Sequence, residues 1–157
     1  MNITLPLKTG YLYEPGSINS SDGVCRPFSQ LANGIVPADG AGIVVLKPLK
    51  SALRDKDSIY AIIKGVGLNN DGQNKSGFIA PSIDGQTRVI KAALKDANIA
   101  ASEVGYVEAH GTGTILGDRI ELAALKQVFQ QDSRKHPARL GSIKSNLGHC
   151  NTAAGVI

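Results

Sequence analysis

The sequence predicts an α/β fold in which parallel strands alternate with helices. Short runs of aliphatic and β-branched residues recur along the chain, and two longer segments carry apolar residues at helical spacing. The order strand, helix, strand, helix, strand over residues 59–144 is typical of a parallel sheet with right-handed crossovers. A length of 157 residues is enough for one domain with its own core.

Two apolar runs in the first half predict strands. Residues 42–47 form a continuous apolar run, which fits a strand that is buried on both faces. Residues 59–66 are rich in β-branched residues and predict a second strand, which the turn-forming run at 69–72 ends. Between them, residues 51–56 predict a helical turn, and the Gly-, Ser- and Pro-rich stretch 11–37 predicts a long, ordered loop.

The clearest helix follows residue 81. Ser82 or Asp84 suits the N-cap, because either side chain can accept a hydrogen bond from an N–H of the first turn. Asn98 suits the left-handed position at the C-terminus of the helix. The apolar face of this helix is predicted to consist of Ile83, Val89, Ile90, Ala93, Leu94 and Ala97.

Two more strands and one more helix complete the predicted sheet. Residues 104–109 and 140–144 predict strands, and a helix is predicted to begin at Asp118, with Asp118 and Glu121 in the relation of a capping box. A polar loop is expected over 132–137. The end of the chain, 151–157, resembles the start of an apolar helix, so we expect the chain to stop within a domain. The apolar stripe of the second helix is predicted to contain Ile120, Ala124, Leu125 and Val128.

The composition excludes several classes of protein. Hydrophobic residues make up 42% of the chain and charged residues 19%, as in a globular protein. The net charge of +4 leaves open an ordinary surface or attraction to an acidic partner. Aromatic residues are only 4% and the basic residues are scattered, so nucleic acid is a poor candidate partner. No apolar run approaches a membrane span, and residues 1–6 lack the positive and apolar stretches of a secretory signal, so we expect no membrane association and a cytoplasmic location.

Two of the three histidines lie in glycine-rich sequence and carry the strongest functional signal. His110 lies within Glu108–Thr114, and His149 ends Lys144–His149; each follows a predicted strand, where α/β folds place their chemistry. We therefore expect one pocket with two imidazoles, although each histidine alone could be a structural side chain in a loop. The hydroxyls of Thr112 and Thr114 suit the amide groups of a flexible ligand arm.

The neighbours of His149 favour acid–base or oxyanion chemistry. A histidine at the N-terminus of the predicted last helix is expected to be neutral, and a neutral imidazole can donate an N–H to a developing oxyanion. Lys144 could add positive potential, with Glu121 as a candidate ion partner. A metal site is disfavoured because no third ligand stands at a familiar spacing. Cys25 and Cys150 lack CxxC spacing and are expected to be reduced and unreactive.

Taken together, these motifs resemble the ketosynthase domain of modular polyketide synthases and, more widely, the β-ketoacyl synthase family. The resemblance extends over essentially the whole chain. It rests on Asp22–Phe28, Asp39–Lys47, Asn69–Gly72, Ala80–Ser82, Glu108–Thr114, Leu116–Asp118 and Gly141–His149.

The resemblance implies a thiolase-like, layered α/β/α fold, usually in a homodimer, of which this chain would be a fragment. Residues 1–80 would be the end of the N-terminal half, and residues 81–157 a truncated C-terminal half. It also implies decarboxylative Claisen condensation of acyl thioesters with malonyl-type extenders, in polyketide or fatty-acid biosynthesis. The substrates would be carried on the phosphopantetheine of acyl carrier protein, with no cofactor bound directly.

The resemblance also assigns roles to single residues. His110 and His149 match the two catalytic histidines of the family, which support decarboxylation and stabilise the enolate. Thr112 and Thr114 match the hydroxyls that bind the phosphopantetheine arm, while no metal is implied.

A supporting charged pair and a nucleophile complete the site of the family. Lys144 and Glu121 match the charged pair. The nucleophilic cysteine, which the family carries in a run of the kind Asp-Thr-Ala-Cys-Ser-Ser, has no match in this chain. We therefore expect acyltransferase activity of the intact parent and none of this chain alone. The alternatives are a ketosynthase-like module that binds or gates acyl carriers without elongation, and an inactive gene fragment.

Overall fold

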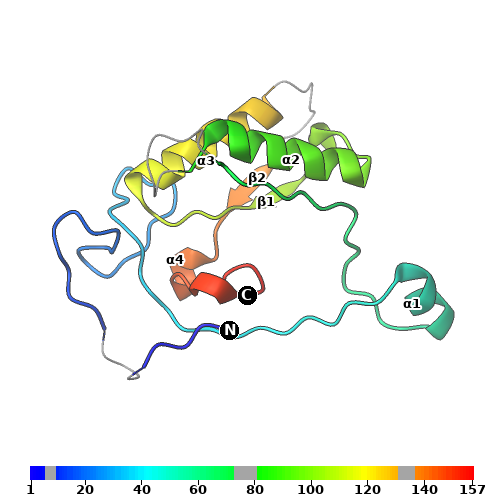
Figure 1. Ribbon diagram of the computed structural model, residues 1–157, viewed down its shortest axis with the longest axis horizontal. Helices are drawn as coiled ribbons and strands as arrows, with labels where there is room; N and C mark the ends of the chain where they lie inside the picture. Colours follow the sequence, from blue (N-terminus) through cyan, green and yellow to red (C-terminus); the bar gives the residue numbers. More distant parts are fainter. Residues whose placement is uncertain (6–9, 73–80, 131–136) are drawn as a thin grey trace.

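The structure is a computed structural model that describes residues 1–5, 10–72, 81–130 and 137–157. Its ordered centre is a small parallel sheet with helices α2 and α3 side by side along one face (Figure 1). Helix α1, Leu49–Asp55, lies away from the sheet, and long extended segments of the chain lead to it and from it. The two ends of the chain lie close together, and the Thr152 hydroxyl donates to the carbonyl of Met1 over 2.8 Å.

The sheet confirms the predicted parallel pairing in the second half of the chain. Strand β1, Tyr106–Glu108, pairs in parallel with β2, Arg139–Gly141, and helix α3, Ile115–Phe129, connects them. The Ala109 N–H extends the ladder by donating to the Gly141 carbonyl over 2.9 Å. Both strands are shorter than predicted. Strand β2 ends before Lys144, because the chain turns there into the short helix α4, Lys144–Leu147.

Helix α2, Ile83–Ala97, confirms the predicted caps. The Ser82 side chain accepts a hydrogen bond from the Gly85 N–H over 3.1 Å, and Asn98 takes the left-handed conformation with φ 53° and ψ 46°. The predicted apolar face is half-buried, and the helix packs against α3. The Thr87 hydroxyl, which is buried, donates to the Gln127 side chain across this contact over 3.0 Å.

Helix α3 begins at Ile115, three residues before the predicted start, and the predicted capping box is wrong. Thr114 is the N-cap and its side chain caps no N–H. The carboxylates of Asp118 and Glu121 accept backbone N–H groups of the preceding loop instead, because that loop folds back over the first turns of the helix. The predicted stripe is confirmed: Ala124 and Val128 are buried, and Ile120 and Leu125 are half-buried.

The strands predicted at 42–47 and 59–66 are wrong. Both segments are extended but unpaired, and Ile43 and Val45 are 94% and 92% exposed. A strand needs a neighbouring backbone for its hydrogen bonds, and no described segment forms a ladder with either run. The second run lies against α2 instead. A Cβ on Gly65 would overlap the backbone nitrogen of Ala97, so only glycine permits this close approach.

Three further predictions concern loops and ends. The helical turn predicted at 51–56 is confirmed as α1. The loop 11–37 is ordered around Ser20, which is 1% exposed and bonded to Asp22, Val24 and Asn33. The predicted last helix is wrong, because the chain forms the short 3₁₀ turn η2, Asn151–Ala153, in its place. Another 3₁₀ turn, η1, spans Ala101–Glu103. The polar loop expected over 132–137 lies, but for its last residue, outside the described residues.

Asp118 connects parts of the chain that are far apart in sequence. Its carboxyl group is buried, and it accepts the Phe28 N–H over 2.6 Å and the Gly113 N–H over 3.1 Å. Buried N–H groups without an acceptor carry a large desolvation cost. This one side chain therefore fixes the 25–28 segment to the start of α3.

We expect Asp118→Ala to lower the free energy of unfolding by about 3 kcal/mol, because two N–H groups lose a charged acceptor. Chemical denaturation of the variant and of wild type gives the difference. Arg119→Ala, an exposed neighbour on the same helix turn, is the matched control and should change it by less than about 0.5 kcal/mol. Equal stability of the Asp118 variant and wild type would contradict this account.

Candidate active site

The imidazoles of His110 and His149 lie against each other. Their ring centroids are 5.2 Å apart and the ring planes are inclined at 84°. His110 lies in the loop after β1, and His149 follows α4. The structure thus brings together the two histidines that the sequence singled out, although they are separated by the whole of α3 and β2.

The loop that carries His110 is fixed by the side chain of Glu121. One carboxylate oxygen accepts the His110 N–H over 2.7 Å and the other accepts the Gly111 N–H over 2.8 Å. Ser142 adds a third contact, since its hydroxyl donates to the Gly111 carbonyl over 3.0 Å. A Cβ on Gly111, whose φ is +41°, would come within 2.6 Å of Ser142, so the loop needs glycine there.

His149 is held by its own backbone and by the residue two positions later. Its N–H donates to the Val36 carbonyl over 2.7 Å, and its carbonyl accepts the Ala38 N–H over 3.1 Å. The Asn151 N–H donates to the Nδ1 atom of the ring over 3.1 Å. Nδ1 is therefore an acceptor, and the neutral ring carries its proton on Nε2.

Both imidazoles are held in the neutral form. The surrounding protein atoms desolvate the His110 ring and lower its pKa, although the residue keeps an exposed surface. The positive charge of Lys144 lowers this pKa further, against the opposing effect of Glu121 and Asp118. Burial also lowers the pKa of His149, with His110 and Lys144 acting in the same direction. At neutral pH each ring can therefore donate one N–H and accept at the other nitrogen.

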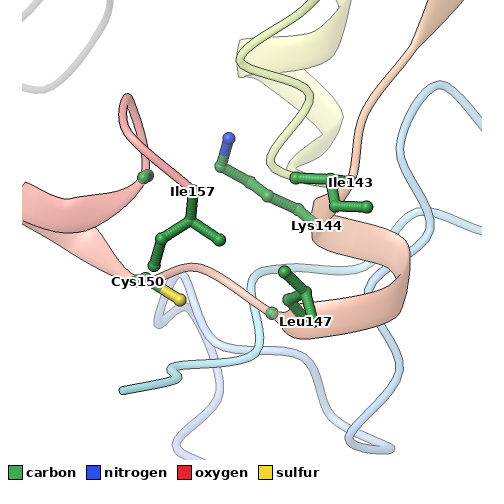
Figure 2. Close-up of a pocket in the computed structure, with 7 residues that line it drawn as sticks. Ile143, Lys144, Leu147, Cys150 and Ile157 are labelled. Carbon is green, nitrogen blue, oxygen red and sulfur yellow. The ribbon is translucent and has the colours of Figure 1, made fainter. Parts of the chain in front are cut away.

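Lys144 is the buried cation of this site. The residue is 4% exposed, and Figure 2 shows its side chain extending between Ile143 and Ile157. Leu147 and Cys150 line the same small, mainly apolar pocket of about 10 Å³. The ion pair expected with Glu121 is absent among the described residues, since both Glu121 oxygens serve the His110 loop.

A larger, open cleft of about 790 Å³ lies beside these groups. Its polar lining comes from β1, from the His110 loop, from α4 and from η2. These residues are Tyr106, Glu108, His110, Lys144 and Asn151. The cleft is large enough to admit a substrate-sized molecule.

Thr112 and Thr114 contact each other through their hydroxyls. The two Oγ1 atoms are 3.0 Å apart, Thr112 is buried and Thr114 is half-buried. Neither residue lines the large cleft. The structure therefore joins the two threonines to each other and, through the loop, to His110.

Both cysteines are buried thiols that donate to backbone carbonyls. Burial raises the pKa of Cys25, and its Sγ atom donates to the Thr112 carbonyl over 3.4 Å. Cys150 is buried and its Sγ atom donates to the Asp39 carbonyl over 3.6 Å. Within the parts of the chain that the structure describes, no cluster of three or more His, Cys, Asp or Glu side chains could hold a metal ion.

Two acidic residues of the site have roles that the sequence pattern does not indicate. The spacing of Asp118 indicates a helix cap, although its carboxylate fixes the Phe28 segment to the loop of His110. Glu108 accepts the Ile143 N–H over 2.7 Å and a hydrogen bond from the Tyr106 hydroxyl. The only available signal is the position of Glu108, two residues before His110 and at the end of a strand.

Comparison with family models covers nearly the whole chain. Residues 2–52 match the model described as the β-ketoacyl synthase N-terminal domain, and residues 60–157 match the β-ketoacyl synthase C-terminal domain.

Within the described ranges, none of the helices combines the length and the apolar character that a bilayer span requires.

Curated proteins similar to this chain include polyketide synthases. One polypeptide of the phenolphthiocerol/phthiocerol polyketide synthase of Mycobacterium tuberculosis is 47% identical over 157 residues, which is 99% of this chain and 11% of that protein. The polyketide synthase PksN of Bacillus subtilis is 46% identical over 148 residues, which is 94% of this chain and 3% of that protein.

Solved ketosynthases share the fold. Ketosynthase twelve of the bacillaene polyketide synthase from Bacillus amyloliquefaciens superposes with a TM-score of 0.88 at 46% identity, over 93% of this chain and 26% of that one. The module 1 ketosynthase of the same organism's bacillaene synthase gives a TM-score of 0.86 at 47% identity, over 91% of this chain and 28% of that one. This chain thus spans about a quarter of their length, and its α/β architecture is part of the layered, thiolase-like fold.

Both family models match, and the solved ketosynthases share the arrangement of the parallel sheet and its helices. The chain therefore belongs to the β-ketoacyl synthase family and corresponds to part of a polyketide synthase ketosynthase domain.

Proposed function

We propose that this chain forms the histidine-bearing part of a ketosynthase site that catalyses decarboxylative Claisen condensation in polyketide biosynthesis. The observation that carries the proposal is the contact between two neutral imidazoles, His110 and His149, at 5.2 Å. Membership of the β-ketoacyl synthase family supports the reaction class.

The reaction consists of two steps. In a malonyl-type thioester, the bond to the carboxylate carbon breaks, carbon dioxide leaves and its electron pair passes into the thioester enolate. The enolate carbon then attacks an acyl thioester held on a cysteine, a C–C bond forms and the C–S bond breaks to release the thiol. Negative charge develops on the thioester oxygen in the first step, so an N–H donor placed there lowers the barrier.

The neutral tautomer of His149 suits this task. Because its Nδ1 accepts the Asn151 N–H, the proton on Nε2 is available to the thioester oxygen. The positive potential of Lys144 disfavours protonation of both rings and would also stabilise a nearby enolate. Glu121 supports the site by fixing the His110 backbone.

The remaining roles concern the substrate carrier and the nucleophile. Thr112 and Thr114 would bind the phosphopantetheine arm of an acyl carrier protein once their mutual hydrogen bond rearranges. The domain would bind no further cofactor and would work as a homodimer. The cysteine that accepts the acyl chain would come from a part of the ketosynthase outside these 157 residues, since Cys25 and Cys150 are both buried and bonded to carbonyls.

The test uses a complete ketosynthase that contains this sequence, with malonyl- and acyl-carrier proteins as substrates. We expect His149→Gln to lower the rate of decarboxylation by about 10²-fold or more, because an oxyanion donor is lost. Arg119→Ala should retain the wild-type rate, and this 157-residue chain alone should give no elongated product. Full activity of the His149 variant, or condensation by this chain alone, would contradict the proposal. Carrier binding without any product would favour a gating module.

The neutral histidines predict a pH dependence of stability. In the folded chain the pKa values of both histidines are below the ordinary value of 6.5. In mildly acidic solution the unfolded chain therefore binds more protons than the folded chain. The stability that the neutral rings provide is fully present above about pH 6.5, and it is lost as the pH falls through the pKa values of the folded state. We expect the melting temperature to fall between about pH 7.5 and about pH 5.5, and to fall less in a His110→Gln/His149→Gln double variant. An equal fall in both proteins would contradict neutral imidazoles.

A further inference from the structure

Glu108 connects the two halves of the histidine site. It is the last residue of β1, and its Oε1 atom accepts the Ile143 N–H over 2.7 Å. Its Oε2 atom accepts a hydrogen bond from the Tyr106 hydroxyl, which lies two residues earlier and so on the same face of the strand. Both oxygens are therefore used, one of them across 35 residues of sequence.

The hydrogen bond to Ile143 is made where the backbone enters helix α4. Ile143 is the N-cap residue of α4, and Lys144 is the first residue of that helix, which has no side-chain cap of its own. Glu108 thus fixes the start of the short segment that presents Lys144 and leads to His149. Glu121 does the equivalent for His110, with both of its oxygens on the backbone of that loop.

We propose that Glu108 is a positioning residue, which sets Lys144 and His149 against His110 through the reach of its side chain to the Ile143 N–H. Its part in the reaction rests on the function proposed above for the histidines. The arrangement itself can be tested without catalysis.

The charge distribution agrees with this role. Glu108 lines the large cleft together with Tyr106, His110 and Lys144. The hydroxyl of Tyr106 and the Ile143 N–H lower the pKa of Glu108, and the positive charge of Lys144 acts in the same direction. The carboxylate is therefore ionised at neutral pH and accepts at both oxygens.

Two substitutions separate the reach of the side chain from its charge. Glu108→Gln keeps the length and an oxygen that can accept the Ile143 N–H, but it removes the charge. Glu108→Asp keeps the charge but shortens the arm by one methylene, so the carboxylate can no longer reach the Ile143 N–H on the neighbouring segment. Glu103 offers a matched control, because it accepts the Ala100 N–H over 2.7 Å and does not line the cleft.

The measurement is an NMR titration of the His149 ring in this chain, with the proximity of the His110 ring followed by cross-relaxation. The groups that act on His149 are His110 and Lys144. We expect Glu108→Asp to raise the pKa of His149 by about half a unit, because the α4 segment moves away from both groups and becomes better solvated. Glu108→Gln and Glu103→Asp should leave it depressed.

Three results would overturn the proposal. They are an unchanged His149 titration in Glu108→Asp, a rise in Glu108→Gln at least as large as in Glu108→Asp, and an equal rise in Glu103→Asp. Should Glu108→Asp fail to fold, Tyr106→Phe provides a second test. It frees one carboxylate oxygen of Glu108 without shortening the side chain, so the pKa of His149 should stay as in wild type. A clear rise in that pKa would contradict the role of the side-chain length of Glu108.

A kinetic measurement in the complete ketosynthase separates this inference from the proposed function. We expect Glu108→Asp to lower kcat about tenfold with KM for the malonyl carrier protein within about twofold, because misplaced donors weaken only the reacting complex. Absence of elongation by the wild-type ketosynthase would refute the proposed function but leave the titration result intact. An elongating wild type with an unaffected Glu108→Asp variant would refute the inference alone.

Discussion

The site depends on carboxylates that accept backbone N–H groups, more than on pairs of opposite charges. Asp118 and Glu121, one turn apart on α3, accept the N–H groups of Phe28, His110, Gly111 and Gly113. A glycine-rich loop has little conformational preference of its own, so it keeps one shape only when such contacts define it. The position of the His110 imidazole therefore depends on two carboxylates of helix α3.

Burial is the main reason that both imidazoles are neutral, and the charge of Lys144 adds to it. If Glu121 were bonded directly to Lys144, much of the cation's potential would be cancelled locally. Because Glu121 is occupied by the His110 loop, the buried charge of Lys144 acts on both rings and favours their neutral forms. The charge of a lysine on α4 thereby adds to burial in favouring the neutral state of both rings.

The sequence predicts local features well and partners poorly. The caps of α2 at Ser82 and Asn98 follow from side-chain chemistry that acts within a few residues. The convergence of the two histidine loops follows from the order of the parallel strands, whose carboxyl ends meet at one edge of the sheet. The segments 42–47 and 59–66 have the pattern of buried strands because burial leaves an apolar pattern, but a pattern does not state which backbone lies alongside. The roles of Asp118 and Glu121 escape prediction for the same reason, since cap spacing cannot show that a loop folds back over the helix.

The tautomer of His149 is set by a main-chain donor, the N–H of Asn151, which lies in a left-handed conformation with φ 42°. A left-handed backbone is open to glycine and asparagine and strained for most other side chains, so this position restricts its own residue while the main chain fixes which ring nitrogen carries the proton.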